Sequence, residues 1–144
     1  MKIGLISDTH DVLTEEVIRI LKDCDEIWHC GDFCHETIYH RIEEIAPLYA
    51  VRGNNDKEDF FDCLEDRLIL ERNGFTFELC HYREKLKDST ADVKCFGHSH
   101  QLFHQEDWLN PGSCGRRRFS LPLNMMILEV TDHITVQEIR FPGK

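Results

Sequence analysis

The chain opens with the stretch KIGLISDTH, residues 2–10, in which a short apolar run leads directly into polar side chains. Such a run, Lys2 to Ile6, is typical of a strand buried in a parallel sheet. Ligand-binding side chains gather beyond the carboxyl ends of parallel strands. The stretch therefore predicts an α/β fold, with Asp8 and His10 in a site at one edge of a sheet.

Two further strand–loop units follow in the first third of the chain. Residues 26–30 and 48–52 are apolar runs, and a helix over 36–45, ended by Pro47, lies between them. A helix after Thr14 precedes them, because Thr14 is a good N-cap. This βαβαβ order predicts parallel strands with right-handed crossovers. The two later strands deliver Gly31-Asp32 and Gly53-Asn54-Asn55-Asp56.

The second half of the chain predicts antiparallel hairpins. Runs at 68–70 and 75–79 flank Asn73-Gly74, a strong hairpin turn signal. A short strand over 93–96 follows, and residues 101–109 and 125–141 each predict one more hairpin. Parallel units followed by hairpins indicate two mixed sheets packed face to face with helices outside.

Composition limits the class of protein. A chain of 144 residues is the size of one domain, which we assign to 1–144. The net charge of −10 argues against long nucleic acid as a partner, and the apolar run at 3–6 is too short for a signal peptide or a membrane span. Seven cysteines, an odd number, favour reduced thiols and a cytoplasmic location. Cys30, Cys34 and His35 also suggest a zinc site, but no second Cys/His pair completes it.

Five short motifs occur in order along the chain: Asp8-Thr9-His10, Gly31-Asp32, Gly53-Asn54-Asn55-Asp56, His81, and Gly97-His98-Ser99-His100. This order and content resemble the calcineurin-like metallophosphoesterases, and in particular their small bacterial and archaeal phosphodiesterases. The resemblance runs from Met1 to about Ser113. It implies a sandwich of two mixed sheets flanked by helices.

The resemblance also implies a dinuclear metal centre with a bridging hydroxide for in-line attack on phosphorus. Two ions lower the pKa of a shared water and neutralise the phosphoryl group. Asp32, Asn54 and His98 are the implied catalytic residues. Donors without thiolate suit Mn²⁺, Ni²⁺, Fe²⁺, Co²⁺ or Zn²⁺, and the resemblance favours Mn²⁺ among them. The implied ligands are Asp8, His10, Asp32 and His100 for one metal and Asp32, Asn54, His81 and His98 for the other, with Asp32 as the bridge.

Each ligand also has an ordinary structural reading. Asp8 could cap a helix, Asn54 could form a turn, and His81 could be a half-buried polar residue. All of these alternatives would have to be true at once in a single chain, which favours the interpretation as metal ligands. His98 and His100 stand two apart, so they converge only in a turn, which Gly97 permits. Asp11 and Asp56 are candidates to orient the histidines.

The chain departs from the larger phosphatases at two positions. Asn55 stands where they place a histidine that assists the leaving group, and Tyr82 stands where the family usually has glycine, which narrows the pocket. Asn55 and Arg116 are the candidate substrate-binding residues. Arg116 begins the run Arg116-Arg117-Arg118, for which an exposed loop is the other reading.

These features predict a metal-dependent phosphodiesterase with a small phosphate ester as substrate, without membrane partners, and with homo-oligomers left open. Two alternatives stand beside it. One is a phosphomonoesterase of a small nucleotide or sugar phosphate. The other is a non-catalytic scaffold similar to the retromer subunit of this fold, for which Phe60, Phe61 and Leu64 would contribute an apolar patch.

Overall fold

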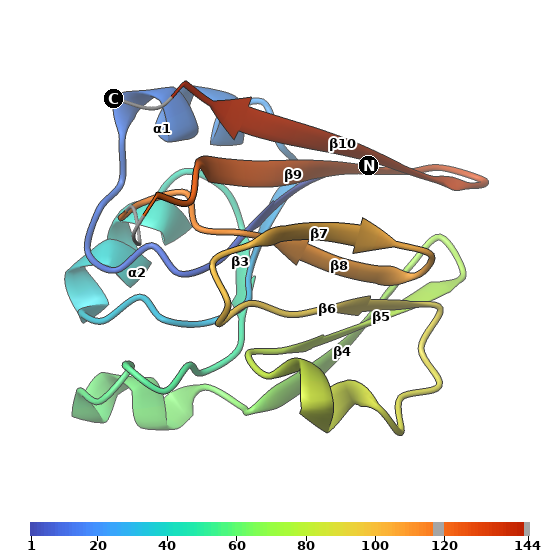
Figure 1. Cartoon of the computed structure of the whole chain (residues 1–144), viewed down its shortest axis with the longest axis horizontal. Coiled ribbons are helices and arrows are strands. Elements are labelled where there is room, and N and C mark those ends of the chain that lie inside the picture. The colour runs from blue at the N-terminus through green and yellow to red at the C-terminus, as the bar shows by residue number, and fades with distance from the viewer. Residues whose placement is uncertain (117–119, 143–144) are drawn as a thin grey trace.

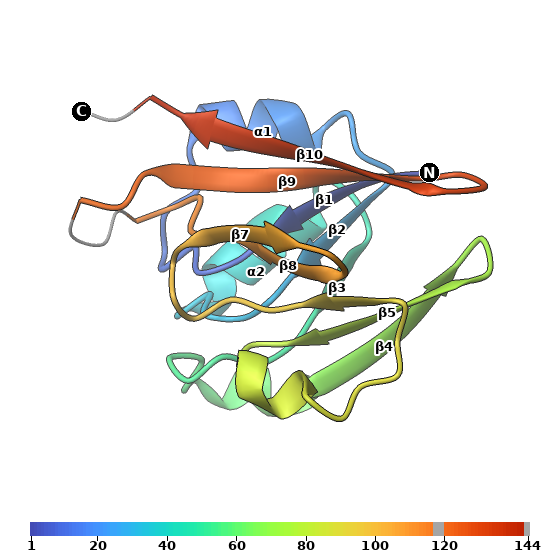
Figure 2. The same ribbon diagram turned by 45° about the vertical axis from the view of Figure 1, so that its right-hand side comes forward.

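The computed structural model describes residues 1–116 and 120–142, and its strands form two five-stranded sheets. The first has the order β10 (Ile134–Phe141), β9 (Leu123–Val130), β1 (Lys2–Ile6), β2 (Glu26–His29), β3 (Leu48–Ala50). The second has the order β4 (Arg67–Arg72), β5 (Phe75–Cys80), β6 (Val93–Cys95), β8 (Trp108–Pro111), β7 (Leu102–Gln105). Figures 1 and 2 show the two sheets as adjacent layers, with α1 (Glu15–Leu21) and α2 (Glu36–Glu43) on the side of the first.

Alternating apolar side chains in the first sheet explain the layers. Ile3 and Leu5 of β1 pack against the second sheet, whereas Ile6 packs against α1 and α2. Because both faces are covered, the strand is buried along nearly its whole length. The β1, β2 and β3 strands are parallel, as predicted. The Thr14 hydroxyl accepts a hydrogen bond from the Val17 N–H at 3.3 Å, which confirms the predicted cap.

The predicted hairpin about Asn73-Gly74 is confirmed in β4 and β5. Both turn residues have positive φ, 51° at Asn73 and 86° at Gly74, as a tight turn with right-handed strand twist requires. The hairpins β7–β8 and β9–β10 are also present. Parallel pairing of β5 with β6 and of β6 with β8 makes the second sheet mixed.

The predicted fold class is confirmed, with one difference in the helices. Both α-helices of the described residues pack on the outer face of the first sheet, through Val17, Leu21, Ile38 and Ile42. Beside the second sheet lie the short 3₁₀ turn η2 (Arg83–Leu86) and a small apolar cluster that includes Phe96. A further 3₁₀ turn, η1 (Asp59–Cys63), follows the third strand. No helix within the described ranges is long and apolar enough to cross a membrane.

Candidate metal centre

The predicted ligands converge at one edge of the sandwich, in loops that follow five strands. Asp8 and His10 follow β1, Asp32 follows β2, and Asn54 follows β3. His81 follows β5, whereas His98 and His100 follow β6. Parallel strands end at the same edge, so His10 and His100, ninety positions apart, become neighbours.

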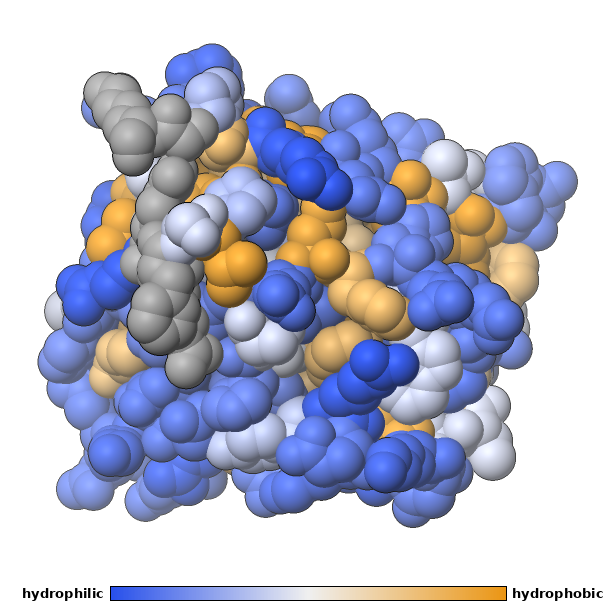
Figure 3. All heavy atoms as spheres, viewed as in Figure 1, coloured by the Kyte–Doolittle hydropathy of each residue, from blue (hydrophilic) through white to orange (hydrophobic). Residues whose placement is uncertain are grey.

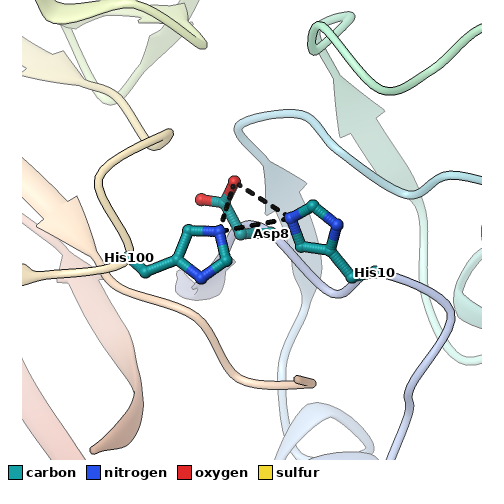
Figure 4. A group of neighbouring side chains, drawn as sticks. All are labelled: Asp8, His10 and His100. Atoms are coloured by element: carbon teal, nitrogen blue, oxygen red, sulfur yellow. Dashed lines mark hydrogen bonds and ion pairs between the residues drawn. The ribbon is translucent and has the colours of Figure 1, made fainter. Parts of the chain in front are cut away.

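Asp8, His10 and His100 form the first group of donors. Figure 4 shows their donor atoms pointing toward one another, with His100 coming from a different loop. His10 Nε2 lies 3.2 Å from His100 Nε2, and Asp8 Oδ1 lies 3.8 Å and 3.6 Å from those two nitrogens. Two donors held about 2.1 Å from one ion stand roughly 3.0–3.6 Å apart at ordinary bond angles. Two of the three distances lie in this range and the third, 3.8 Å, lies slightly above it, so the group is suited to share a cation.

The second group is arranged around His81. Its Nε2 lies 3.0 Å from Asn54 Oδ1 and 3.4 Å from Asp32 Oδ2. His98 Nδ1 lies 3.3 Å from the same nitrogen. Asp32 Oδ2 also lies 3.5 Å from His10 Nε2, so this oxygen reaches both groups of donors.

The electrostatics of the buried carboxylates favour a cation. Asp8 is fully buried, and no hydrogen bond within the described part of the chain reaches its Oδ1. Burial alone would raise the pKa of Asp32, but the hydrogen bond and charge of His81, with the hydrogen bonds from Asn55, hold this pKa far below its usual range. Burial would lower the pKa of His81, and the Asp32 and Asp8 carboxylates raise it instead. The arrangement thus draws a positive charge, and a bound metal would displace the His81 proton.

The groups that orient the histidines differ from those predicted. His81 Nδ1 donates to the Cys30 carbonyl at 2.8 Å, which directs Nε2 at the other donors. His10 Nδ1 lies 3.2 Å from Cys34 Sγ. The prediction that Asp11 and Asp56 orient ligand histidines was wrong, because Asp11 bonds to His35.

Asp56 instead fixes the loop that carries Asp32. Its two oxygens accept hydrogen bonds from four backbone N–H groups, those of Asp32, Phe33, Cys34 and Gly53, at 2.7–2.9 Å. The side chain is buried, so these bonds are not shared with solvent. Asp56 therefore holds the loops after β2 and β3 together, one step removed from the donors.

Glycine is needed at two places because the loops approach closely. A Cβ at Gly53 would stand 2.1 Å from Asp32 Oδ1, and one at Gly97 would stand 2.1 Å from Ser7 Oγ. The turn that brings His98 and His100 together lies in the histidines themselves, whose φ values are 74° and 64°. Gly97 was expected to supply that turn, but it supplies room against the Ser7–Asp8 segment.

A pocket of about 270 Å³ lies over the donors and is lined by His10, Asp32, Asn54, Asn55, His98, His100 and Arg116. Both predicted substrate-binding residues therefore border it. The Asn55 side chain also donates to Asp32 Oδ2 at 3.0 Å, and its backbone N–H donates to Asp32 Oδ1 at 2.8 Å. Arg117 and Arg118 lie outside the described residues. The Tyr82 ring lies beside the donors, 5.0 Å from the His98 ring between centroids.

Sequence reasoning missed two residues at the site. His29 is fully buried beneath the Asp32 loop, accepts a hydrogen bond from the Gly31 N–H, and lies 3.1 Å from Thr9 Oγ1. Cys34 was considered only as part of a zinc site, whereas its sulfur contacts His10. A histidine that ends an apolar strand just before Gly31-Asp32 was the signal available for His29.

Comparison with known proteins agrees with this geometry. The family model for the calcineurin-like phosphoesterase superfamily domain matches residues 1–133. Phosphodiesterase MJ0936 of Methanocaldococcus jannaschii is 32% identical, over 79% of this chain and 84% of that protein.

Two solved structures show the fold. Vps29 of Entamoeba histolytica, described as complexed with Zn²⁺, has a TM-score of 0.77 at 18% identity, covering 99% of this chain and 100% of that one. Yfce, a phosphoesterase from E. coli, has a TM-score of 0.72 at 22% identity, covering 90% of this chain and 88% of that one.

Proposed function

Because this chain belongs to the calcineurin-like phosphoesterase superfamily, we propose that it hydrolyses phosphodiesters with two divalent ions, of which Mn²⁺ is the first candidate. The observation that carries the proposal is the place of Asp32 Oδ2, 3.5 Å from His10 Nε2 and 3.4 Å from His81 Nε2. A carboxylate in reach of both groups of donors is suited to bridge two ions.

The donor groups divide between the ions as follows. Asp8, His10, Asp32 and His100 would hold one ion, and Asp32, Asn54, His81 and His98 would hold the other. Asp32, Asn54 and His98 border the pocket and would be nearest to the reaction. When bound, two ions supply a water of lowered pKa and neutralise negative charge on the phosphoryl group.

The remaining residues prepare the site for a phosphate ester. Two hydrogen bonds from Asn55 already hold the Asp32 carboxylate in one orientation. The carboxylate therefore loses no further orientational freedom when it binds a metal. Arg116 at the pocket wall offers a phosphate oxygen a positive partner. Position 55 carries no imidazole, so the chain offers the leaving oxygen no general acid there.

A diester suits the pocket better than a monoester. Among the described residues that line it, Arg116 is the one permanently cationic side chain, and the chain carries a net charge of −10. A diester brings one negative charge, whereas a monoester dianion brings two. The name of the M. jannaschii relative, a phosphodiesterase, points the same way.

The location and partners follow from the same features. All seven cysteines are free, which supports the proposal of a reducing, cytoplasmic location. The acidic net charge supports a small phosphate ester in place of long nucleic acid as substrate.

The scaffold alternative rests on the Vps29 likeness, which shows the fold alone. The apolar patch that it needs is not formed at residues 60–64. Phe61 is fully buried, and Phe60 packs against Tyr39 with ring centroids 5.0 Å apart. Both side chains contribute to the core beside the helices.

Metal titration joined to an activity assay tests the proposal. Metal-free protein is reconstituted with Mn²⁺, its metal content is measured, and it is assayed against matched p-nitrophenyl diesters and monoesters. We expect two ions per chain, no activity after chelation, and faster turnover of diesters. Undiminished hydrolysis by metal-free protein would refute the metal-dependent mechanism, and preference for monoesters would establish the alternative substrate class.

A further inference from the structure

A second pocket, of about 230 Å³, lies next to the metal centre and shares His98 with the first. It is bordered by η2, by the end of β6 and by β7, so it belongs to the second sheet alone. Figure 3 shows apolar surface in the middle of this face, over β6, β7 and β8, with strongly hydrophilic surface beside it. An organic group attached to phosphorus at the metal centre would therefore meet an apolar surface past His98.

Part of the wall of this pocket is aromatic. Phe96 and Phe103 line it, with ring centroids 6.1 Å apart. The Arg83 guanidinium lies over the Phe103 ring at 4.7 Å and over the Phe96 ring at 5.5 Å. Stacked guanidinium and aromatic groups attract further flat rings.

The charges around the pocket select a neutral ring over a second anion. Arg83 is exposed, and within the described residues its guanidinium lies over aromatic rings and has no carboxylate partner. Glu84 also lines the pocket, and its charge would repel a second phosphate. A neutral aromatic ring can stack in the pocket without being repelled by Glu84.

We propose that this pocket binds the aromatic ring of the substrate's ester group, so that the enzyme prefers aryl or nucleobase-bearing esters over alkyl esters. A cavity of about 150 Å³ is enough for benzene, so the pocket has room for one ring system. The inference rests on the proposed function, because the ring reaches the pocket only when phosphorus is held at the metal centre. Phe103 and Arg83 then determine specificity through contact with the ring.

Binding of phosphonates tests the proposal without any dependence on leaving-group acidity. Affinities of Mn²⁺-loaded protein for the monoanionic methyl esters of methylphosphonate, cyclohexylmethylphosphonate and benzylphosphonate, which mimic a diester, are measured by calorimetry. We expect the benzyl compound to bind about tenfold tighter than the methyl compound, with the cyclohexyl compound between them. Phe103→Leu keeps apolar volume but removes the flat ring, and Arg83→Ala removes the guanidinium. Each should abolish most of the benzyl preference, whereas Lys87→Ala, at the end of η2, should keep it.

The outcomes separate this inference from the proposed function. Equal affinity for benzyl and methyl compounds in the wild-type protein would overturn the aromatic pocket while leaving the metal centre intact. A benzyl preference that survives both Phe103→Leu and Arg83→Ala would overturn it as well. Failure of every phosphonate to bind would overturn the proposed function and, with it, the pocket.

Discussion

Acid should destabilise this protein through His29, the buried histidine that ends β2. Its Nδ1 accepts a hydrogen bond from the Gly31 N–H at 3.0 Å, so the proton of the neutral ring lies on Nε2, toward Thr9. Burial lowers the pKa of His29 from 6.5 to about 3, although the charges of Asp8 and Asp32 act in the opposite direction. The fold therefore holds this ring neutral at a pH where the unfolded chain protonates it.

The size and sign of the effect follow from linkage. As pH falls below 6.5, the unfolded chain binds a proton at this position that the folded chain does not bind. Stability is then lost with falling pH, by about 1.4 kcal/mol per unit, until the folded pKa near 3 is reached. Between about pH 7.5 and about pH 5 the loss attributable to His29 is roughly 2 kcal/mol.

Urea unfolding of metal-free protein at these two pH values, followed by tryptophan fluorescence, measures the loss. His29→Gln removes the titrating group, so this variant should lose about 2 kcal/mol less than the wild type over the same interval. His133→Gln removes an exposed histidine at the β9–β10 turn and is the matched control. Equal losses in wild type and His29→Gln would refute the assignment of a neutral buried ring.

Three further predictions concern the metal centre. Asp32→Asn should lose both ions and reduce activity at least about a hundredfold, whereas His100→Ala should lose mainly one ion. Metal analysis with turnover assays distinguishes the two variants, and retention of both ions in Asp32→Asn would contradict the bridging role of Asp32. Asn55→His should flatten the dependence of log rate on leaving-group pKa, since general acid catalysis is worth about 10²–10⁴-fold; equal slopes would show that position 55 takes no part in leaving-group departure. Cys34→Ala should weaken Mn²⁺ binding about tenfold, because the Cys34 sulfur orients His10. Metal titration of this variant and of the exposed control Cys63→Ala measures the effect, and equal affinities would argue against a role for Cys34.

Local signals were enough to predict most of the fold. The Thr14 cap and the Asn73-Gly74 turn depend on neighbouring residues alone, and both are present. The boundaries were less certain, because strands end where loops adopt special conformations. The strand expected over residues 26–30 ends at His29, just before Gly31 with its φ of 103°.

The convergence of the donors was also predictable, because each follows a strand whose carboxyl end faces the same edge. The supporting contacts were not. Asp56 is committed to backbone N–H groups of two loops, and His81 to the carbonyl of Cys30, 51 residues away. Such contacts depend on how separate loops meet, which no local pattern encodes.

The left-handed backbone at the donors has a consequence for the history of the site. Asp8, His10, Asp32, His98 and His100 have φ values between 46° and 74°, where a side chain costs roughly 1 kcal/mol that glycine avoids. Replacing any of them by glycine would relieve this strain while removing a donor. A descendant released from selection for catalysis would gain from this relief where the contacts of the lost side chain are replaced, such as the hydrogen bonds of Asp32 with Asn55. Glycine at these positions in a relative would thus mark a site that has lost its donors, whereas this chain keeps a donor side chain at all five.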